Sequence, residues 1–202
     1  HMKLTIELMK RLSLYLFLIL FALQAPSQAD DIRDFQIEGI SIGDSLLDFF
    51  SRKEIIDNIN SESTFEYKDR KFVQIGTSKN SFEIYEIVGL IIKPNDKDFI
   101  IYGISGQFSF GDEIEKCYTK QNTISKDIDD LVGENTKKIE WDAKYKQDAT
   151  GKSKVKYIDY QFKDSSEIRI ICYDMSKDFH DPNDALYVAV NSIEFSEFLI
   201  NL

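Results

Sequence analysis

The sequence feature that most constrains how this chain can be interpreted is a short apolar run near its N-terminus. Residues 12–23 carry no charge and are mostly aliphatic or aromatic, and the basic residues before them are Lys3, Lys10 and Arg11. A basic segment followed by an apolar segment is typical of a secretory signal peptide. The run is about a dozen residues long, whereas a membrane-spanning helix needs roughly 20. We therefore expect residues 1–29 to be a signal peptide.

The cleavage site is expected after Ala29, because Ser27 and Ala29 place small residues where a signal peptidase requires them. His1 has the character of a cloning scar, which leaves His180 as the only native histidine. The first cysteine of the chain is Cys117, so the junction lacks the residue that a lipid anchor would use. These features predict a soluble periplasmic or secreted protein that meets the membrane only through its signal peptide, before cleavage.

The cysteines Cys117 and Cys172 are the only two in the chain, and an oxidising compartment favours their pairing. Cys117 belongs to an apolar stripe with helical spacing, and Cys172 shares one strand face with Ile168 and Ile170. A helix-to-sheet disulfide is therefore expected. The alternative is a pair of buried free thiols.

Charge limits the partners of the exported form. The chain has 25 basic and 35 acidic residues, and removal of residues 1–29 takes away three basic residues and one acidic residue. The remaining net charge of about −12 disfavours general binding of nucleic acid or anionic lipid, since the long-range field repels both. The expected partner is an unknown periplasmic protein or a small ligand.

The apolar pattern of residues 30–202 predicts a single α+β domain. Alternating segments between Phe65 and Val190 favour an antiparallel sheet of about six strands, one of which is expected to run without a break from Phe82 to Ile92. Apolar residues at three- and four-residue steps predict one main helix from Asp112 to Val132, packed on one face of the sheet. Capping patterns predict two short N-terminal helices between Ser45 and Ile59. We detect no internal repeat.

The most site-like cluster surrounds a turn late in the chain. It offers an imidazole and several carboxylates as ligands for a metal such as calcium: Asp174, Asp178, His180, Asp181 and Asp184. The same residue types are also common in ordinary turns, and the cluster lacks the glycine of a calcium loop. A structural turn is the competing interpretation.

The segment from Lys137 to Lys156 differs in composition, since it holds seven lysines in an otherwise acidic chain. We expect an exposed hairpin tip or loop there. Its basic and aromatic residues form a candidate interaction loop: Lys137, Lys138, Trp141, Lys144, Tyr145 and Lys146. A merely solvated loop is the alternative, because acidic residues interrupt the run.

No catalytic set is apparent. Nucleophilic catalysis needs a base beside the nucleophile, and His180 is the single imidazole available. Phosphate-binding glycine loops and zinc-ligand spacings are absent, so no cofactor is expected. Paired carboxylates remain a candidate for hydrolysis, because the 34 acids of the mature chain supply many pairs.

The segment Asp34 to Asp48, with the sequence D-F-Q-I-E-G-I-S-I-G-D-S-L-L-D, resembles the start of a group of uncharacterised exported proteins from streamlined marine alphaproteobacteria. In that group a signal peptide precedes a similar segment, and the resemblance implies export without implying an activity. The sequence thus favours a non-enzymatic binding or interaction module. A carboxylate-based hydrolase and a calcium-dependent binding protein are the alternatives.

Overall fold

The computed structural model describes residue 29, residues 31–77 and residues 82–201. The expected signal peptide, except for Ala29, lies outside the described residues. The helices in the described part are α2 (Arg52–Ile59), α3 (Ile114–Asp129) and α4 (Ile193–Ile200), and the 3-10 turns are η1 (Ile32–Asp34), η2 (Leu46–Asp48) and η3 (Lys68–Arg70). None of the described helices is both long and apolar enough to cross a lipid bilayer.

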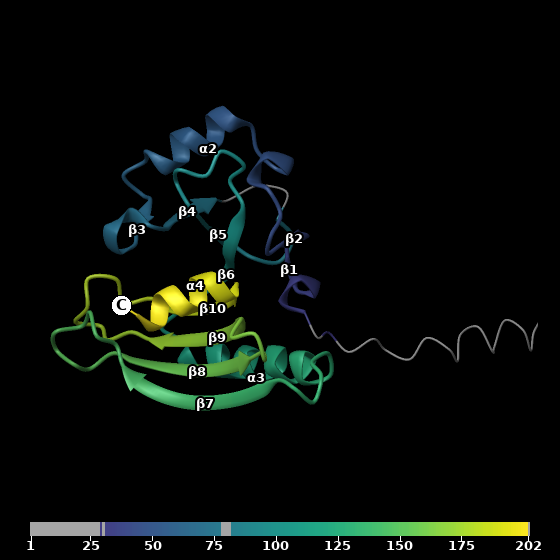
Figure 1. Ribbon diagram of the computed structural model, residues 1–202. Coiled ribbons are helices and arrows are strands. Elements are labelled where there is room, and N and C mark those ends of the chain that lie inside the picture. The colour runs from purple at the N-terminus through teal and green to yellow at the C-terminus, as the bar shows by residue number, and fades with distance from the viewer. Residues whose placement is uncertain (1–28, 30, 78–81, 202) are drawn as a thin grey trace, which may run out of the picture.

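The described strands form one large sheet and one small hairpin (Figure 1). The large sheet contains β3 (Phe65–Glu66), β4 (Val73–Thr77), β5 (Ile87–Ile92), β6 (Ile101–Gly111), β7 (Lys137–Lys144), β8 (Lys154–Gln161), β9 (Glu167–Asp174) and β10 (Asp184–Asn191). The hairpin joins β1 (Gln36–Ile37) to β2 (Ile40–Ser41). All neighbouring strands of the large sheet are antiparallel. The α+β class is confirmed, but the expected number of about six strands is too small.

The order of the strands divides the sheet into two similar halves. It runs β3-β4-β5-β6 and then β10-β9-β8-β7, so the last strands of the two halves, β6 and β10, pair at the centre. A helix precedes each set of four strands, α2 in the first half and α3 in the second. The repeat is one of topology, and we find no corresponding repeat in the sequence.

One face of the sheet, which we call the helix face, packs against the helices α2 and α3. Its strand residues alternate with those of the opposite face, as in β9, where Ile168, Ile170 and Cys172 are buried. Cys172 forms a disulfide with Cys117 of α3, with an S–S distance of 2.02 Å and Cα atoms 6.0 Å apart. The helix-to-sheet bridge is therefore confirmed.

The Lys137 to Lys156 segment accounts for part of the error in the strand number. It is not a continuous loop, because residues 137–144 form β7, residues 154–156 begin β8, and only residues 145–153 connect them. β7 is the outer strand and exposes charged side chains along its length, which hides the alternation of Ile139, Trp141 and Ala143.

Expectations for two other segments, the short N-terminal helices and the strand from Phe82, are corrected. The first of the two short helices is the 3-10 turn η2, and the second is α2, which begins with the expected Ser51 and Glu54 capping box. The strand expected from Phe82 begins only at Ile87. The backbone N–H groups of residues 83–85 instead donate to the carboxylate of Glu38, at 2.8–3.0 Å.

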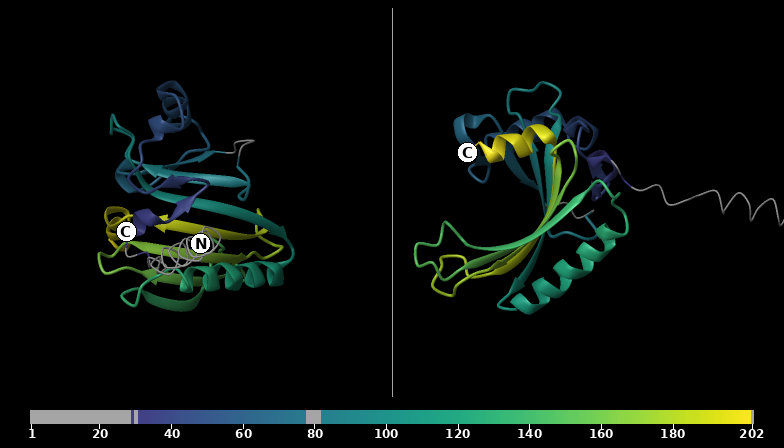
Figure 2. Two further views of the ribbon diagram at one scale, coloured as in Figure 1. Left: turned by 90° about the vertical axis from the view of Figure 1, so that its right-hand side faces the viewer. Right: turned by 60° about the horizontal axis from the view of Figure 1, so that its bottom comes forward.

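The opposite face, which we call the open face, lies inside the bend of the sheet (Figure 2). The helix α4 covers its first half, where Phe195 is buried against Phe72 and Ile91. Between β6 and β7 no helix of the described residues covers the open face, whereas α3 lies on the other side of these strands (Figure 2).

Candidate binding groove

A row of mostly apolar side chains crosses the open face at right angles to the strands. The register pairs its members directly from one strand to the next, in the order Trp141, Tyr157, Ile171, Tyr187, Gln107 and Ile87. Strands lie about 4.8 Å apart, so this row is roughly 24 Å long. The aromatic members lie in the second half of the sheet, where none of the helices in the described part of the chain covers the open face.

A groove of about 650 Å³ lies on this face beside the row. It is lined by residues of β3, β4, β6, β9 and β10 and of the loops that follow β7 and β9. Six of its lining residues are aromatic carbocycles: Phe65, Tyr67, Tyr145, Tyr173, Phe179 and Tyr187. The amides of Gln74, Gln107, Gln147 and Asn183 add hydrogen-bonding capacity.

The aromatic rings of one wall pack edge to face against each other. Tyr145 lies 5.6 Å from Tyr173 and 5.7 Å from Phe179, and Tyr173 lies 5.3 Å from Tyr187, measured between ring centroids. Burial raises the pKa of Tyr145, Tyr173 and Tyr187, so their hydroxyl groups stay protonated at neutral pH and can act as donors. The wall therefore offers ring edges and neutral hydroxyls.

The groove is poor in charge. Among the described residues that line it, His180 is the only one of a basic type and Asp181 the only carboxylate. In the whole chain, 30% of the residues are charged. Since a charged ligand would find few partners here, the lining favours a neutral one.

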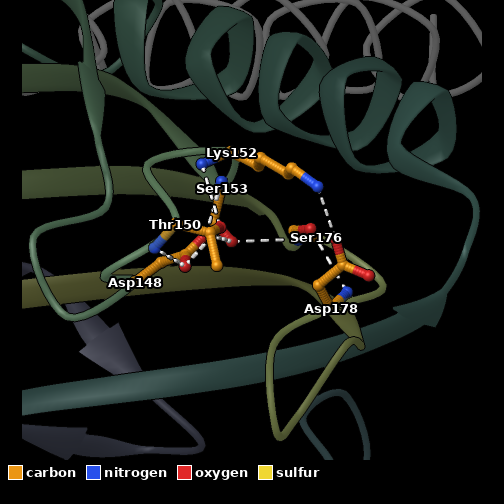
Figure 3. A network of polar contacts seen from close by, with 6 residues as sticks. All are labelled: Asp148, Thr150, Lys152, Ser153, Ser176 and Asp178. Carbon is orange, nitrogen blue, oxygen red and sulfur yellow. Dashed lines mark hydrogen bonds and ion pairs between the residues drawn. The ribbon is translucent and has the colours of Figure 1, made fainter.

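A polar network holds the two loops of this wall together (Figure 3). Asp148, in the loop after β7, accepts bonds of 2.7–2.8 Å from the backbone N–H and the hydroxyl of both Thr150 and Ser153. These hydrogen bonds lower the pKa of Asp148. Ser153 in turn accepts a bond from the backbone N–H of Ser176, and Lys152 pairs with Asp178 at 2.5 Å. The loops that carry Tyr145 and Phe179 are thereby fixed relative to each other.

A second cluster lies at the β7 end of the row. The indole N–H of Trp141 donates to Asp159 at 2.7 Å, and Asp159 also accepts two bonds from Arg169, at 3.0 and 3.2 Å. The ring of Trp141 stacks on that of Tyr157, with centroids 3.9 Å apart and planes 6° from parallel. Asp159 is only 4% exposed, so these contacts hold the Trp141 ring in a defined orientation.

The five residues of the predicted metal site have separate roles. His180 and Asp181 line the groove, where His180 packs on Phe179 at 4.1 Å and Asp181 accepts from Asn183. Asp178 pairs with Lys152, and Asp184 is buried, which raises its pKa, and accepts from the Met175 backbone. Asp174 ends β9. Among the described residues, no three His, Cys, Asp or Glu side chains are arranged to share a metal ion.

The predicted interaction loop is divided between the faces of the sheet. Trp141 is in the row of the open face and Tyr145 is in the groove wall. Lys138 lies on the helix face, where it pairs with Asp129 at 2.8 Å. Lys137, Lys144 and Lys146 are exposed. The aromatic residues, rather than the lysines, therefore belong to the candidate site.

The sequence patterns did not indicate most residues of the candidate site, among them Tyr157, Asp159, Arg169, Tyr173 and Tyr187. Each alternates with a buried aliphatic residue of its strand, so its place on the second face could be inferred. Their assembly could not, because it depends on the register between β7, β8, β9 and β10.

The fold and the groove together define an α+β protein with a curved antiparallel sheet and an aromatic open face. Comparison of the chain with family models, with curated proteins and with solved structures found no match.

Proposed function

We propose that this protein is an exported, non-enzymatic binding protein whose groove receives an uncharged segment of a partner polypeptide. The observation that carries the proposal is the composition of the groove, which is rich in aromatic residues and poor in charge in a highly charged chain. Enrichment in tyrosine and depletion of charged residues are typical of the centre of a protein interface. Tyrosine also supplies a large contact area at low cost in conformational entropy.

The ring geometry favours a polypeptide over a carbohydrate. Sugars stack on the open faces of aromatic rings, whereas Tyr145, Tyr173 and Phe179 turn toward one another. What remains accessible is ring edges, hydroxyls and amides, which suit the mixed apolar and hydrogen-bonding surface of a peptide segment.

A hydrolase that uses two carboxylates has less support. Asp181 is the only carboxylate among the described residues that line the groove, and such a mechanism needs an acid and a base on opposite sides of the substrate. Calcium-dependent binding is likewise less favoured, since Asp178 and Lys152 already form an ion pair.

Export to the periplasm is part of the proposal. It is supported by the basic and apolar order of residues 3–23 and by the disulfide, a bond that persists in oxidising compartments. Expression of the gene with its own N-terminus should yield a periplasmic protein whose intact mass corresponds to a start at Asp30. Recovery from the cytoplasm with residues 2–29 still attached would contradict this part.

The binding proposal can be tested with a library of random linear peptides displayed on phage. Selection on the immobilised protein should enrich a consensus of neutral residues, because the groove offers few charged partners. Trp141 is the only tryptophan of the chain, so a change in its emission on adding a selected peptide reports occupation of the open face.

Matched variants test whether the selected peptides bind in the groove. Tyr145→Ala and Gln107→Ala alter the groove, whereas Ile56→Ala changes an exposed apolar residue of α2 outside it. We expect the first two to weaken peptide binding about tenfold or more, as interface tyrosines often do, and the third to leave it unchanged. The absence of any consensus, or equal binding by all three variants, would refute the proposal.

A further inference from the structure

Three planar groups from neighbouring strands form a stack on the open face. Tyr157 of β8 is covered on its β7 side by the parallel ring of Trp141. The guanidinium of Arg169, from β9, lies over the same tyrosine ring, 5.3 Å from its centroid. The order across the strands is therefore a cation, a tyrosine ring and an indole ring.

Buried contacts fix this stack before any partner binds. Asp159 holds the indole N–H of Trp141 and the guanidinium of Arg169 at the same time. Its side chain is 6% exposed, and that of Arg169 is 24% exposed. A group held in this way loses little conformational entropy on binding, which is the property expected of an interface anchor.

The stack is open at its outer end. β7 is the outermost strand of the sheet, and Trp141 is 40% exposed. Among the described residues, no lysine or arginine lies over the indole of Trp141 itself, whereas Arg169 lies over the neighbouring ring of Tyr157. The free ring face can therefore accept one more group.

We propose that this free face of Trp141, which lies outside the groove, binds an arginine side chain that flanks the uncharged segment of the partner polypeptide; the proposal rests on the proposed function of the open face. A guanidinium is planar and cationic, so it both stacks on an indole and is attracted by its electron-rich face. Tryptophan is the strongest aromatic acceptor for such a cation. The chain carries a formal net charge of −10, so its long-range field also attracts a basic segment.

The arginine site on Trp141 can be probed without knowledge of the partner. A ¹⁵N-labelled sample shows one indole N–H signal, from Trp141, which can be titrated with N-acetyl-arginine amide and with its neutral isostere N-acetyl-citrulline amide. We expect a shift of the indole signal that grows with the concentration of the arginine compound, and a clearly weaker response to citrulline. An equal response to the two compounds, or none to either, would overturn the inference.

Peptides selected on the protein supply the second test. A selected neutral peptide is extended by one arginine outside the segment that enters the groove, and in a matched peptide by one citrulline. The arginine peptide should bind the native protein roughly two- to fivefold more tightly than the citrulline peptide, and the two should bind the Trp141→Ala variant equally. If peptides bind the groove but neither the citrulline peptide nor the Trp141→Ala variant shows altered binding, the arginine site is refuted and the proposed function stands. If the indole responds to arginine but no peptide is selected, the proposed function fails by itself.

Discussion

Asp159 connects two strands that flank its own. It accepts from Trp141 of β7 and from Arg169 of β9, and both partners lie on the open face. In the sequence it is one acidic residue between Ile158 and Tyr160, with nothing that marks it as paired. Its partners are 18 and 10 residues away, and only the register of three strands brings them together.

Loss of the Asp159 carboxylate should destabilise the fold. In Asp159→Ala the guanidinium of Arg169 loses its main partner while it stays largely buried, and breaking a buried pair in this way costs on the order of 3 kcal/mol. Urea unfolding followed by tryptophan emission and by circular dichroism measures this change.

A matched control for this variant is Asp57→Ala, which breaks the exposed ion pair with Lys53 on α2. Exposed pairs of this kind contribute little, so its urea midpoint should not move. Equal destabilisation by the two substitutions would mean that burial of the Asp159 pair has no special role.

At the scale of elements, the disulfide ties α3 to β9. The two cysteines are 55 residues apart, and the loop they close includes β7 and β8. In the chain-entropy description, a loop of this length stabilises the folded state by about 4 kcal/mol.

The Cys117→Ala, Cys172→Ala double variant should therefore unfold at a much lower urea concentration than the native protein. Reduction with a phosphine should lower the native midpoint by a similar amount and leave that of the double variant unchanged. A thiol reagent should find no reactive thiol in the denatured, unreduced native protein. Two reactive thiols there would contradict the bridge.

Elements differ in how far the sequence predicts them. The stripe that holds Cys117 and Ile128 has a clear helical spacing, and α3 is found within the predicted range. In β7 only Ile139, Trp141 and Ala143 are apolar, and charged neighbours on an outer strand mask their alternation. The late start of β5 depends on the distant Glu38 carboxylate, which local propensity cannot reveal.

At the scale of the whole molecule, several carboxylates have pKa values that folding lowers. Arg33 lowers the pKa of Asp31 to about 2. Burial raises the pKa of Glu38, but hydrogen bonds from three backbone N–H groups lower it by more. Burial also raises the pKa of Asp129, where hydrogen bonds from Lys138 and Tyr160 have the larger, opposite effect. Asp184 shifts in the opposite direction, since burial raises its pKa.

A lowered pKa means that the charged form stabilises the folded state. This contribution is complete above the unfolded pKa of about 4 and is lost as the pH falls through the folded value. We expect the urea midpoint to decline between about pH 4 and pH 2, with the Asp184 effect opposing it in part. Glu38→Gln should show a lower midpoint at pH 7 and a shallower decline. A midpoint independent of pH in this window would contradict the assignment.

The sequence does not predict the topology of the whole sheet. Alternation predicts which residues are buried in β9 and β10, but it does not predict that β10 pairs with β6 across the centre. The resulting two-half arrangement creates the bend and the groove, so the candidate site could be predicted only in fragments such as Trp141, Tyr145, His180 and Asp181.

The central position of β10 also has a consequence for the order of assembly. This strand is near the C-terminal end of the chain and lies between β6 and β9. Both of those strands therefore keep an unpaired edge until residues 184–191 have been synthesised and have paired with them. During synthesis or translocation from the N-terminus, the two half-sheets therefore cannot be joined before the chain is almost complete. Exposed edges of this kind promote association between chains, and an export route that keeps the polypeptide unfolded until its release avoids that hazard.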